Sequence, residues 1–325
     1  MNDFNCAPIL LIGFNRPDFM ADQIAAVRKV APRKIYLAVD GPRKDRPSEG
    51  EKCRAVQECA KLIDWTCEIN TLFQDENLGC KYGPYRAMDW LFAHEEYGIV
   101  LEDDCRPTVD FLRFASEMLE KYAEDDRIGA VNGFNHFNLQ SDKSASYHFS
   151  SHMDVLGWAS WRRVWHSYDI TLEKYNGVLE SIISSSQMTP YTKKMFKAFV
   201  DGLARGLDAW DIQFSIMMLA HGWLSVVPRN RLVANVGFAD ERAAHTSGYI
   251  YWSKDWSRAG SLDWPLVHPA EVVCDDVADR LRERMEGAIF PRGLTWLGSK
   301  FPLIGGLVAF VGEVAEKIAP FLFRW

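Results

Sequence analysis

The sequence predicts an α/β protein with a mainly parallel sheet flanked by helices. Short apolar runs alternate with helical segments over residues 8–132, and each run ends in a turn or a polar cluster. The 325 residues are enough for one large domain with an appended region. Strict alternation of strand and helix is typical of a parallel sheet that helices cover on both faces. In such sheets ligands bind beyond the carboxyl ends of the strands.

Each expected element follows from a local pattern. The strands are short apolar runs over residues 8–14, 35–39, 67–73, 99–101 and 128–132. The helices between them are expected over residues 18–30, 48–63, 85–96 and 108–122. Ser48 and Glu51 have the spacing of a capping box, which places the start of the second helix.

The chain divides into three regions. Residues 1–145 carry the alternation and form the first half of the predicted domain, and residues 146–293 lose it. In this second half we expect a tryptophan-rich stretch at 157–165, helices at 190–204 and 211–220, a strand at 224–228 and a loop-rich segment at 229–245. We interpret it as a region packed on the same sheet. Residues 294–325 form an apolar C-terminal tail.

Composition excludes some classes of protein. The formal net charge of -7 argues against a nucleic-acid partner, which would require a basic stripe. The seven cysteines are odd in number and include no CxxC pair, so we expect neither a disulfide framework nor a zinc site. The N-terminus has no basic segment before its apolar run, as a secretory signal would. These features predict a reducing, cytoplasmic setting.

Polar residues directly follow three of the expected strands. Arg16 lies after the first, Asp40 after the second, and Glu102-Asp103-Asp104 after the fourth. Three consecutive carboxylates repel one another unless a cation or hydrogen-bond donors share the site. Mg²⁺ and Mn²⁺ bind carboxylate oxygens together with phosphate oxygens and water. The acidic run, residues 102–104, therefore predicts a binding site for a metal–diphosphate complex, with a solvated loop as the alternative.

Four segments in order carry a family resemblance. They are residues 11–17 (LIGFNRP), 38–43 (AVDGPR), 75–79 (DENLG) and 100–104 (VLEDD). In this order they resemble bacterial GT-A glycosyltransferases of surface polysaccharide assembly, and over residues 7–135 they are similar to N-acetylglucosaminyltransferase I. Residues 157–163 (GWASWRR) and Trp210-Asp211 resemble the bacterial branch alone. The resemblance implies the Rossmann-like GT-A fold, a nucleotide-sugar donor, and Mn²⁺ or Mg²⁺ as cofactor.

Carried over by position, the resemblance implies a role for each part of the strand-end edge. Asp104 would ligate the metal, while Glu102 and Asp103 would face the hydroxyls of the donor sugar and the ribose. The rest of the donor pocket would be lined by Phe14, Asn15, Arg16, Asp40, Gly79 and Lys81. The structural alternatives are a surface turn at Asp40, a salt-bridged Arg16 and an ordinary turn at residues 77–79.

Four further candidates lie in the second half of the chain. Asp211 is the predicted general base, because an inverting transfer needs one carboxylate to take the proton of the acceptor hydroxyl. A helix N-cap is its alternative role. His245 resembles a late histidine that approaches the metal in GT-A enzymes, and imidazole binds Mn²⁺. Trp158 and Trp161 are predicted to shape the acceptor pocket, with core packing as the competing account.

The tail leaves two interpretations open. Its uninterrupted apolar run covers residues 301–312, which is shorter than the ~20 residues that a membrane span requires. Bulky apolar groups beside Lys300, Lys317 and Arg324 are typical of an interfacial helix. Residues 300–325 therefore predict either peripheral contact with the inner membrane face or a helix docked on the core.

Together these observations predict a metal-dependent glycosyltransferase, either a hexosyltransferase or an N-acetylhexosaminyltransferase. It would move a sugar, with inversion, from a nucleotide diphosphate donor to a hydroxyl of a glycan or lipid-linked glycan; the resemblance favours a UDP-sugar. A sugar-1-phosphate nucleotidyltransferase would carry a glycine-rich loop after the first strand, where this chain has residues 14–17 (FNRP). A Rossmann dehydrogenase would carry G-x-G-x-x-G there. A non-catalytic sugar-binding protein on the same fold remains an alternative.

Overall fold

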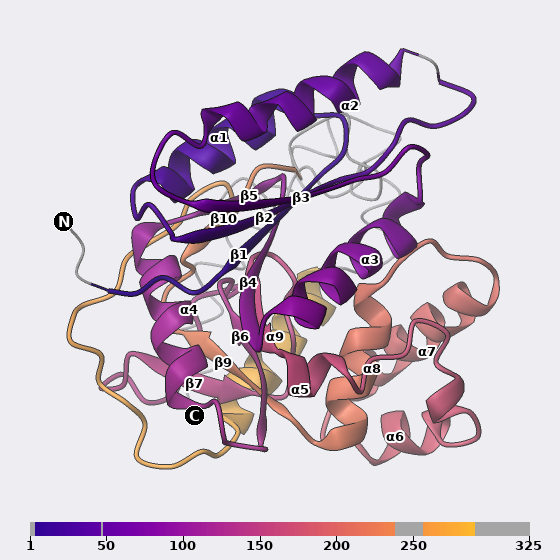
Figure 1. The fold of residues 1–325 in the computed structure, drawn as a ribbon. Coiled ribbons are helices and arrows are strands. Elements are labelled where there is room, and N and C mark those ends of the chain that lie inside the picture. Colours follow the sequence, from indigo (N-terminus) through magenta and orange to yellow (C-terminus); the bar gives the residue numbers. More distant parts are fainter. Residues whose placement is uncertain (1–3, 47, 238–255, 290–325) are drawn as a thin grey trace, which may run out of the picture.

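The structure is a computed structural model that describes residues 4–46, 48–237 and 256–289 (Figure 1). It confirms the predicted α/β class. An eight-stranded sheet has the order β3-β2-β1-β4-β8-β6-β9-β7, and β10 and β5 form a separate pair. The strands are β1 (Ile9–Gly13), β2 (Lys34–Val39), β3 (Glu68–Phe73), β4 (Tyr97–Glu102), β5 (Cys105–Pro107), β6 (Ile128–Asn132), β7 (Tyr147–Ser150), β8 (Trp158–Trp161), β9 (Leu224–Pro228) and β10 (Val233–Asn235).

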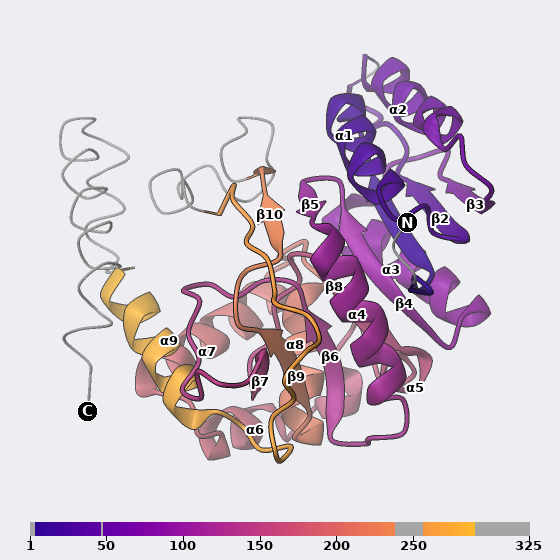
Figure 2. The ribbon, with the colours of Figure 1, turned by 90° about the vertical axis from the view of Figure 1, so that its left-hand side faces the viewer.

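Helices cover both faces of this sheet. Figures 1 and 2 show α3 on one face of β4 and α4 on the other, and both helices pack against β4. The helices are α1 (Pro17–Arg28), α2 (Glu49–Glu58), α3 (Gly79–His94), α4 (Val109–Lys121), α5 (Arg162–Trp165), α6 (Leu179–Ser185), α7 (Pro190–Ala204), α8 (Asp211–His221) and α9 (Asp276–Ile289), with 3₁₀ turns at Cys59–Leu62 and Glu173–Tyr175.

The sheet is parallel in its first half and mixed in its second. β3, β2, β1 and β4 run parallel to one another, and so do β6 and β9. β8 is inserted antiparallel between β4 and β6, and β7 runs antiparallel to β9 at the edge. Strands from residues beyond 145 thus complete the sheet that the first half begins.

Two helix starts differ from the prediction. α3 begins at Gly79 rather than at residue 85, because carboxylates from other segments bind its first N–H groups. Ser48 occupies the N-cap position of α2, but its side chain makes no capping hydrogen bond and its backbone is itself helical (φ -66°, ψ -15°). The expected capping box is therefore absent, and Glu49 in the first turn pairs with Arg43 instead.

The two tryptophans predicted for the acceptor pocket belong to the core. Trp158 is 0% exposed, stacks on Trp210 with ring centroids 5.7 Å apart, and meets Phe214 edge-on at 4.9 Å. Trp161 is 3% exposed, and its indole N–H donates to the carbonyl of Leu119 at 3.0 Å. Because all four residues of β8 are buried, neither ring offers a face to an acceptor. Core packing, the competing account, describes both.

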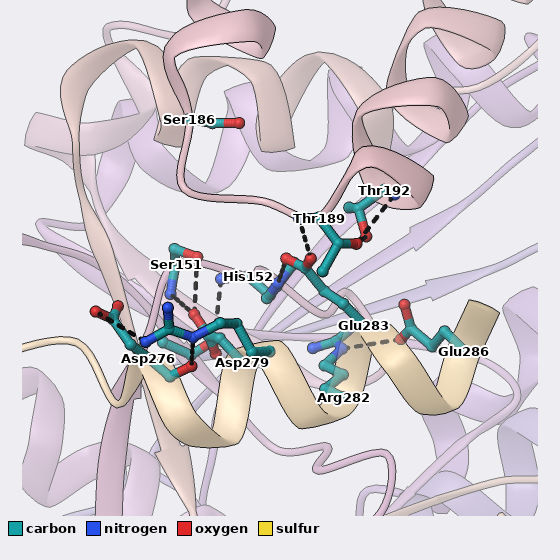
Figure 3. A network of polar contacts seen from close by, with 12 residues as sticks. Ser151, His152, Ser186, Thr189, Thr192, Asp276, Asp279, Arg282, Glu283 and Glu286 are labelled. Carbon is teal, nitrogen blue, oxygen red and sulfur yellow. Dashed lines mark hydrogen bonds and ion pairs between the residues drawn. The ribbon is translucent and has the colours of Figure 1, made fainter. Parts of the chain in front are cut away.

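Helix α9 is attached mainly by polar contacts (Figure 3). Asp279 accepts hydrogen bonds from the hydroxyls of Ser150 and Ser151, and Glu283 accepts from His152 at 2.9 Å and from the N–H of Thr189. The apolar contacts of this helix form a small cluster apart from the main core, around Met285, Leu281, Phe137 and Leu139. Charge pairing therefore holds α9 in place.

An ion pair between Arg282 and Asp154 also attaches α9. The guanidinium donates to both carboxylate oxygens, at 2.8 and 2.9 Å; the Arg282 side chain is 16% exposed and that of Asp154 is 6% exposed. Burial acts to raise the pKa of Asp154, but the charges of Arg282 and His136 outweigh burial and hold this pKa below its usual range. The contribution of Asp154 to stability is therefore present above about pH 4 and is lost as the pH falls toward the lower pKa of the folded state.

We expect Asp154→Ala to lower the free energy of unfolding by about 1–3 kcal/mol at pH 7, because Arg282 would lose one of its two carboxylate partners and keep Glu286. Urea denaturation followed by circular dichroism measures the change. The double variant Asp154→Leu/Arg282→Leu is the control and should recover much of the loss, since it removes both charges. A single variant as stable as the wild type would show that the pair does not hold α9.

All seven cysteines lie in the described part of the chain, and each is a free thiol. Among the helices of the described residues, none combines the length and the apolar character needed to cross a membrane. His245 and the tail at 300–325, two of the predicted functional elements, lie outside the described residues.

Candidate functional site

The predicted strand-end residues gather along one edge of the sheet. β1 lies between β2 and β4, and the register pairs Gly13 with Val39 and Ile12 with Glu102. The residues that follow these three strands are therefore neighbours. The apolar runs predict this arrangement directly, because parallel strands end on the same side.

Glu102 is the focus of negative charge at this edge. Burial, together with the charges of Asp104, Asp103 and Asp211, raises the pKa of Glu102 to about 8. The indole N–H of Trp210 donates to Glu102 Oε1 at 3.3 Å and opposes this rise. The contribution of Asp211 shows that the start of α8 faces the acidic run from more than 100 residues away in sequence.

Asp103 is turned away from the open edge and pairs with Arg16. The Arg16 guanidinium donates to both carboxylate oxygens of Asp103, through Nε at 3.1 Å and through Nη2. Asp103 is 4% exposed, and burial raises its pKa to about 6 although the charge of Arg16 opposes the rise. Both residues were predicted to face the donor. The structure instead joins them in a buried ion pair, which leaves Glu102 and Asp104 as the carboxylates nearest to solvent.

Asp104 is held by the last residue of β10 and by the residue after it. Its Oδ1 accepts from the side-chain amide of Asn235 at 3.1 Å, and its carbonyl accepts from the N–H of Val236 at 2.9 Å. A Cβ added at Gly237 would lie 2.2 Å from Asp104 Oδ2, so any other residue there would displace the Asp104 carboxylate. Arg16 Nη2 lies 3.7 Å from the same oxygen. Sequence reasoning missed Asn235 and Gly237, because their partner is 131 or more residues away.

Asp40 organises the loop between β3 and α3. Its carboxylate accepts from the N–H groups of Gly41, Leu78 and Gly79 and from the side-chain amide of Asn77 at 2.8 Å. Burial raises the pKa of Asp40, while the backbone donors act in the opposite direction. Because these donors take up both oxygens, little capacity is left for a base N–H. The structure thus gives Asp40 a loop-ordering contact network where the sequence predicted a nucleoside contact.

Gly79 and Lys81 lie at the first turn of α3, against Asp208. The carboxylate of Asp208 accepts from the N–H of Cys80 at 2.9 Å and from that of Lys81 at 2.8 Å. The close approach that Gly79 was predicted to allow a ligand is therefore taken by Asp208. The ammonium of Lys81 lies 5.4 Å from the ring centroid of Tyr82.

Phe14 and Asn15 form a second group at the end of β1. The Arg43 guanidinium lies 5.4 Å from the centroid of the Phe14 ring, and the amide of Asn15 donates to Glu49 Oε1 at 3.3 Å. Arg43 also pairs with Glu49, whose pKa is lowered chiefly by that hydrogen bond. These four residues line the edge beside Arg16.

The chemistry of the acidic run suits a divalent cation. In the described residues, no group of three or more His, Cys, Asp or Glu side chains could hold a metal ion by itself. Mg²⁺ commonly uses one or two carboxylates and completes its shell with substrate phosphates and water. Burial is the largest cause of the raised pKa values of Glu102 and Asp103, and the neighbouring charge of Asp104 adds to both. Hard carboxylate oxygens with excess negative charge fit Mg²⁺ or Mn²⁺.

Comparisons with known proteins show only distant likeness. No family model and no curated protein matches this sequence. Among solved structures, the chain is similar to HddC from Yersinia pseudotuberculosis (13% identity, 50% of this chain and 80% of that one, TM-score 0.33). It is also similar to GalNAc-T7 with UDP, GalNAc and Mn²⁺, at 12% identity over 70% of this chain and 43% of that one, with a TM-score of 0.40. A third similar structure is the glycosyltransferase GlyE of Streptococcus pneumoniae TIGR4, at 11% identity over 68% of this chain and 45% of that one, with a TM-score of 0.31. The chain spans less than half the length of the last two, and none of the three assigns it a function.

Proposed function

We propose that this protein is a metal-dependent glycosyltransferase that uses a nucleotide diphosphate sugar, preferentially a UDP-sugar. The observation that carries the proposal is the acidic run at the end of strand β4, where the indole of Trp210, the residue before Asp211, donates to Glu102. The GT-A resemblance of the four sequence segments supports the same reading. The acceptor we propose is a hydroxyl of a glycan or a lipid-linked glycan.

In this proposal Asp104 holds the divalent cation, with His245 as a further ligand proposed from sequence. When bound, the cation would stabilise the negative charge of the departing diphosphate. Asn235 keeps the Asp104 carboxylate in place through its hydrogen bond to Oδ1, and Gly237 leaves room for Oδ2. Arg16, fixed by Asp103, adds a positive charge 3.7 Å from Asp104.

The remaining groups orient the donor and move a proton. Glu102, held by the Trp210 indole, accepts a hydrogen bond from a hydroxyl of the donor sugar. Phe14 and Asn15, beside Arg43 and Glu49, form the side on which the nucleoside binds. Asp211 takes the proton of the acceptor hydroxyl while that oxygen attacks the anomeric carbon. The bond from this carbon to the diphosphate oxygen breaks on the opposite side, so that the nucleoside diphosphate leaves and transfer proceeds with inversion.

Isothermal titration of UDP, GDP and dTDP, each with Mn²⁺ and with chelator, tests the proposal. We expect one nucleotide, UDP, to bind in Mn²⁺ and to lose most of its affinity in chelator. Analysis of products from UDP-sugars should then show free UDP and a transferred or hydrolysed sugar. Absence of nucleotide binding under every condition would refute the donor site, and formation of a nucleotide sugar from a sugar 1-phosphate would instead identify a nucleotidyltransferase.

A further inference from the structure

Helix α3 begins without a cap of its own. Leu78 occupies the N-cap position and provides no side-chain hydrogen bond, and the first turn contains no acidic residue. A helix start leaves N–H groups without intrahelical partners and carries partial positive charge. Two carboxylates from distant segments supply what is missing. Asp40 accepts from the N–H of Gly79 at 3.3 Å, and Asp208 accepts from the next two.

Asp208 comes to α3 from the connection between α7 and α8. It lies 128 residues from Cys80 and 127 from Lys81 along the chain. Gly79 has φ +79°, and a Cβ there would be 2.7 Å from Asp208 Oδ2. The glycine thus serves two purposes, because it adopts a left-handed conformation and admits this carboxylate.

The same connection carries Trp210 and ends at Asp211. Trp210 is fixed on its other side, since its indole donates to Glu102 and its carbonyl accepts from the Tyr168 hydroxyl at 2.8 Å. Burial raises the pKa of the Cys80 thiol to about 11, and the charges of Asp208, Glu102 and Asp40 contribute to the rise. The start of α3 is therefore the place where the donor-side loop, the acidic run and the α7–α8 connection meet.

We propose that Asp208 is a positioning residue, which sets Asp211 relative to the donor-side loop at 77–81 by tying the α7–α8 connection to the start of α3. The inference rests on the proposed function. A shift of about 1 Å in a positioned catalytic group can reduce turnover by about 100-fold. The contact also places a carboxylate on the N–H groups of Cys80 and Lys81, at a helix start that would otherwise attract an anion.

The test compares Asp208→Ala and Asp208→Asn with the control Asp142→Ala. Asp142 is likewise exposed and accepts from backbone N–H, but within its own turn at Ser144. Hydrogen exchange is followed at residues 79–82 and 208–213, and kcat and KM are measured for UDP release from a panel of UDP-sugars. We expect Asp208→Ala to speed exchange in both segments and to lower kcat by about 10-fold or more, with KM within about twofold. Asp208→Asn keeps one acceptor oxygen, so it should recover most of the wild-type kcat and most of the protection from hydrogen exchange.

The results distinguish failure of the proposed coupling from failure of the proposed function. Unchanged kcat in Asp208→Ala, or faster exchange at 79–82 alone, would overturn the coupling. Equal losses in Asp142→Ala would do the same, because they would indicate a general effect of the substitution. If the wild type releases no UDP but Asp208→Ala still speeds exchange in both segments, the proposed function fails while the contact between the two segments stands.

Discussion

Asp104→Asn should reduce the affinity for UDP in Mn²⁺ by about 100-fold or more, to the level seen with chelator. Loss of an outer contact to a metal ligand typically costs about 10- to 100-fold in affinity, and removal of the ligand itself costs at least as much. The amide can still accept from Asn235, so the segment around β10 should keep its place. Titration calorimetry with UDP, in Mn²⁺ and in chelator, measures the change.

The matched control for this variant is Asp126→Asn, which removes an exposed carboxylate in the turn after α4. It should bind UDP as the wild type does, because it lies away from the acidic run in sequence and on the surface. A thermal midpoint within about 2 °C of the wild type would show that Asp104→Asn remains folded. If Asp104→Asn then binds UDP with metal-dependent affinity equal to that of the wild type, Asp104 is not the metal ligand.

Asp211→Asn should lower the turnover of UDP-sugars by about 10²- to 10⁴-fold, the range for loss of a general base. The affinity for UDP should stay within about twofold, since the proposed role of Asp211 concerns the acceptor and not the nucleotide. Release of UDP with water as acceptor gives the rate, and titration with UDP in Mn²⁺ gives the affinity.

Asp276→Asn provides the comparison, because Asp276 is also an acidic residue in the first turn of a helix, α9, and is exposed. Its turnover should equal that of the wild type. Turnover of Asp211→Asn within about threefold of the wild type would remove Asp211 from the mechanism. A parallel loss of UDP affinity would place it at the donor rather than at the acceptor.

The strand-end edge could be predicted because its cause is local. An apolar run followed by polar residues marks where a buried strand ends, and neighbouring parallel strands end together. Glu102, Arg16 and Asp40 therefore fall where the sequence predicts. Their partners follow from tertiary contacts. Nothing near Arg16 in sequence indicates that it binds Asp103, 87 residues away.

Other features escaped sequence analysis for a related reason. Asp208 and Asn235 act on residues more than 120 positions away, and no pattern around either one marks it. Trp158 illustrates a different limit, because an indole suits both a sugar face and a core, and composition does not distinguish them. β8 has only four residues, all buried, so it lacks the alternation that would identify an antiparallel strand.

The place of β8 in the sheet has a consequence for how the chain folds as it is synthesised. β4 pairs with β1 on one side and with β8 on the other, and β8 follows β4 by more than 50 residues. Until residues 158–161 leave the ribosome, the edge of the strand that carries the acidic run has unpaired backbone groups, which are a template for aggregation. One edge of β6 likewise stays unpaired until β9, which begins at Leu224, has been synthesised. We infer that a nascent chain ending near residue 150 exposes an aggregation-prone strand edge at β4. Completion of the sheet is then a late step that requires long-range contacts.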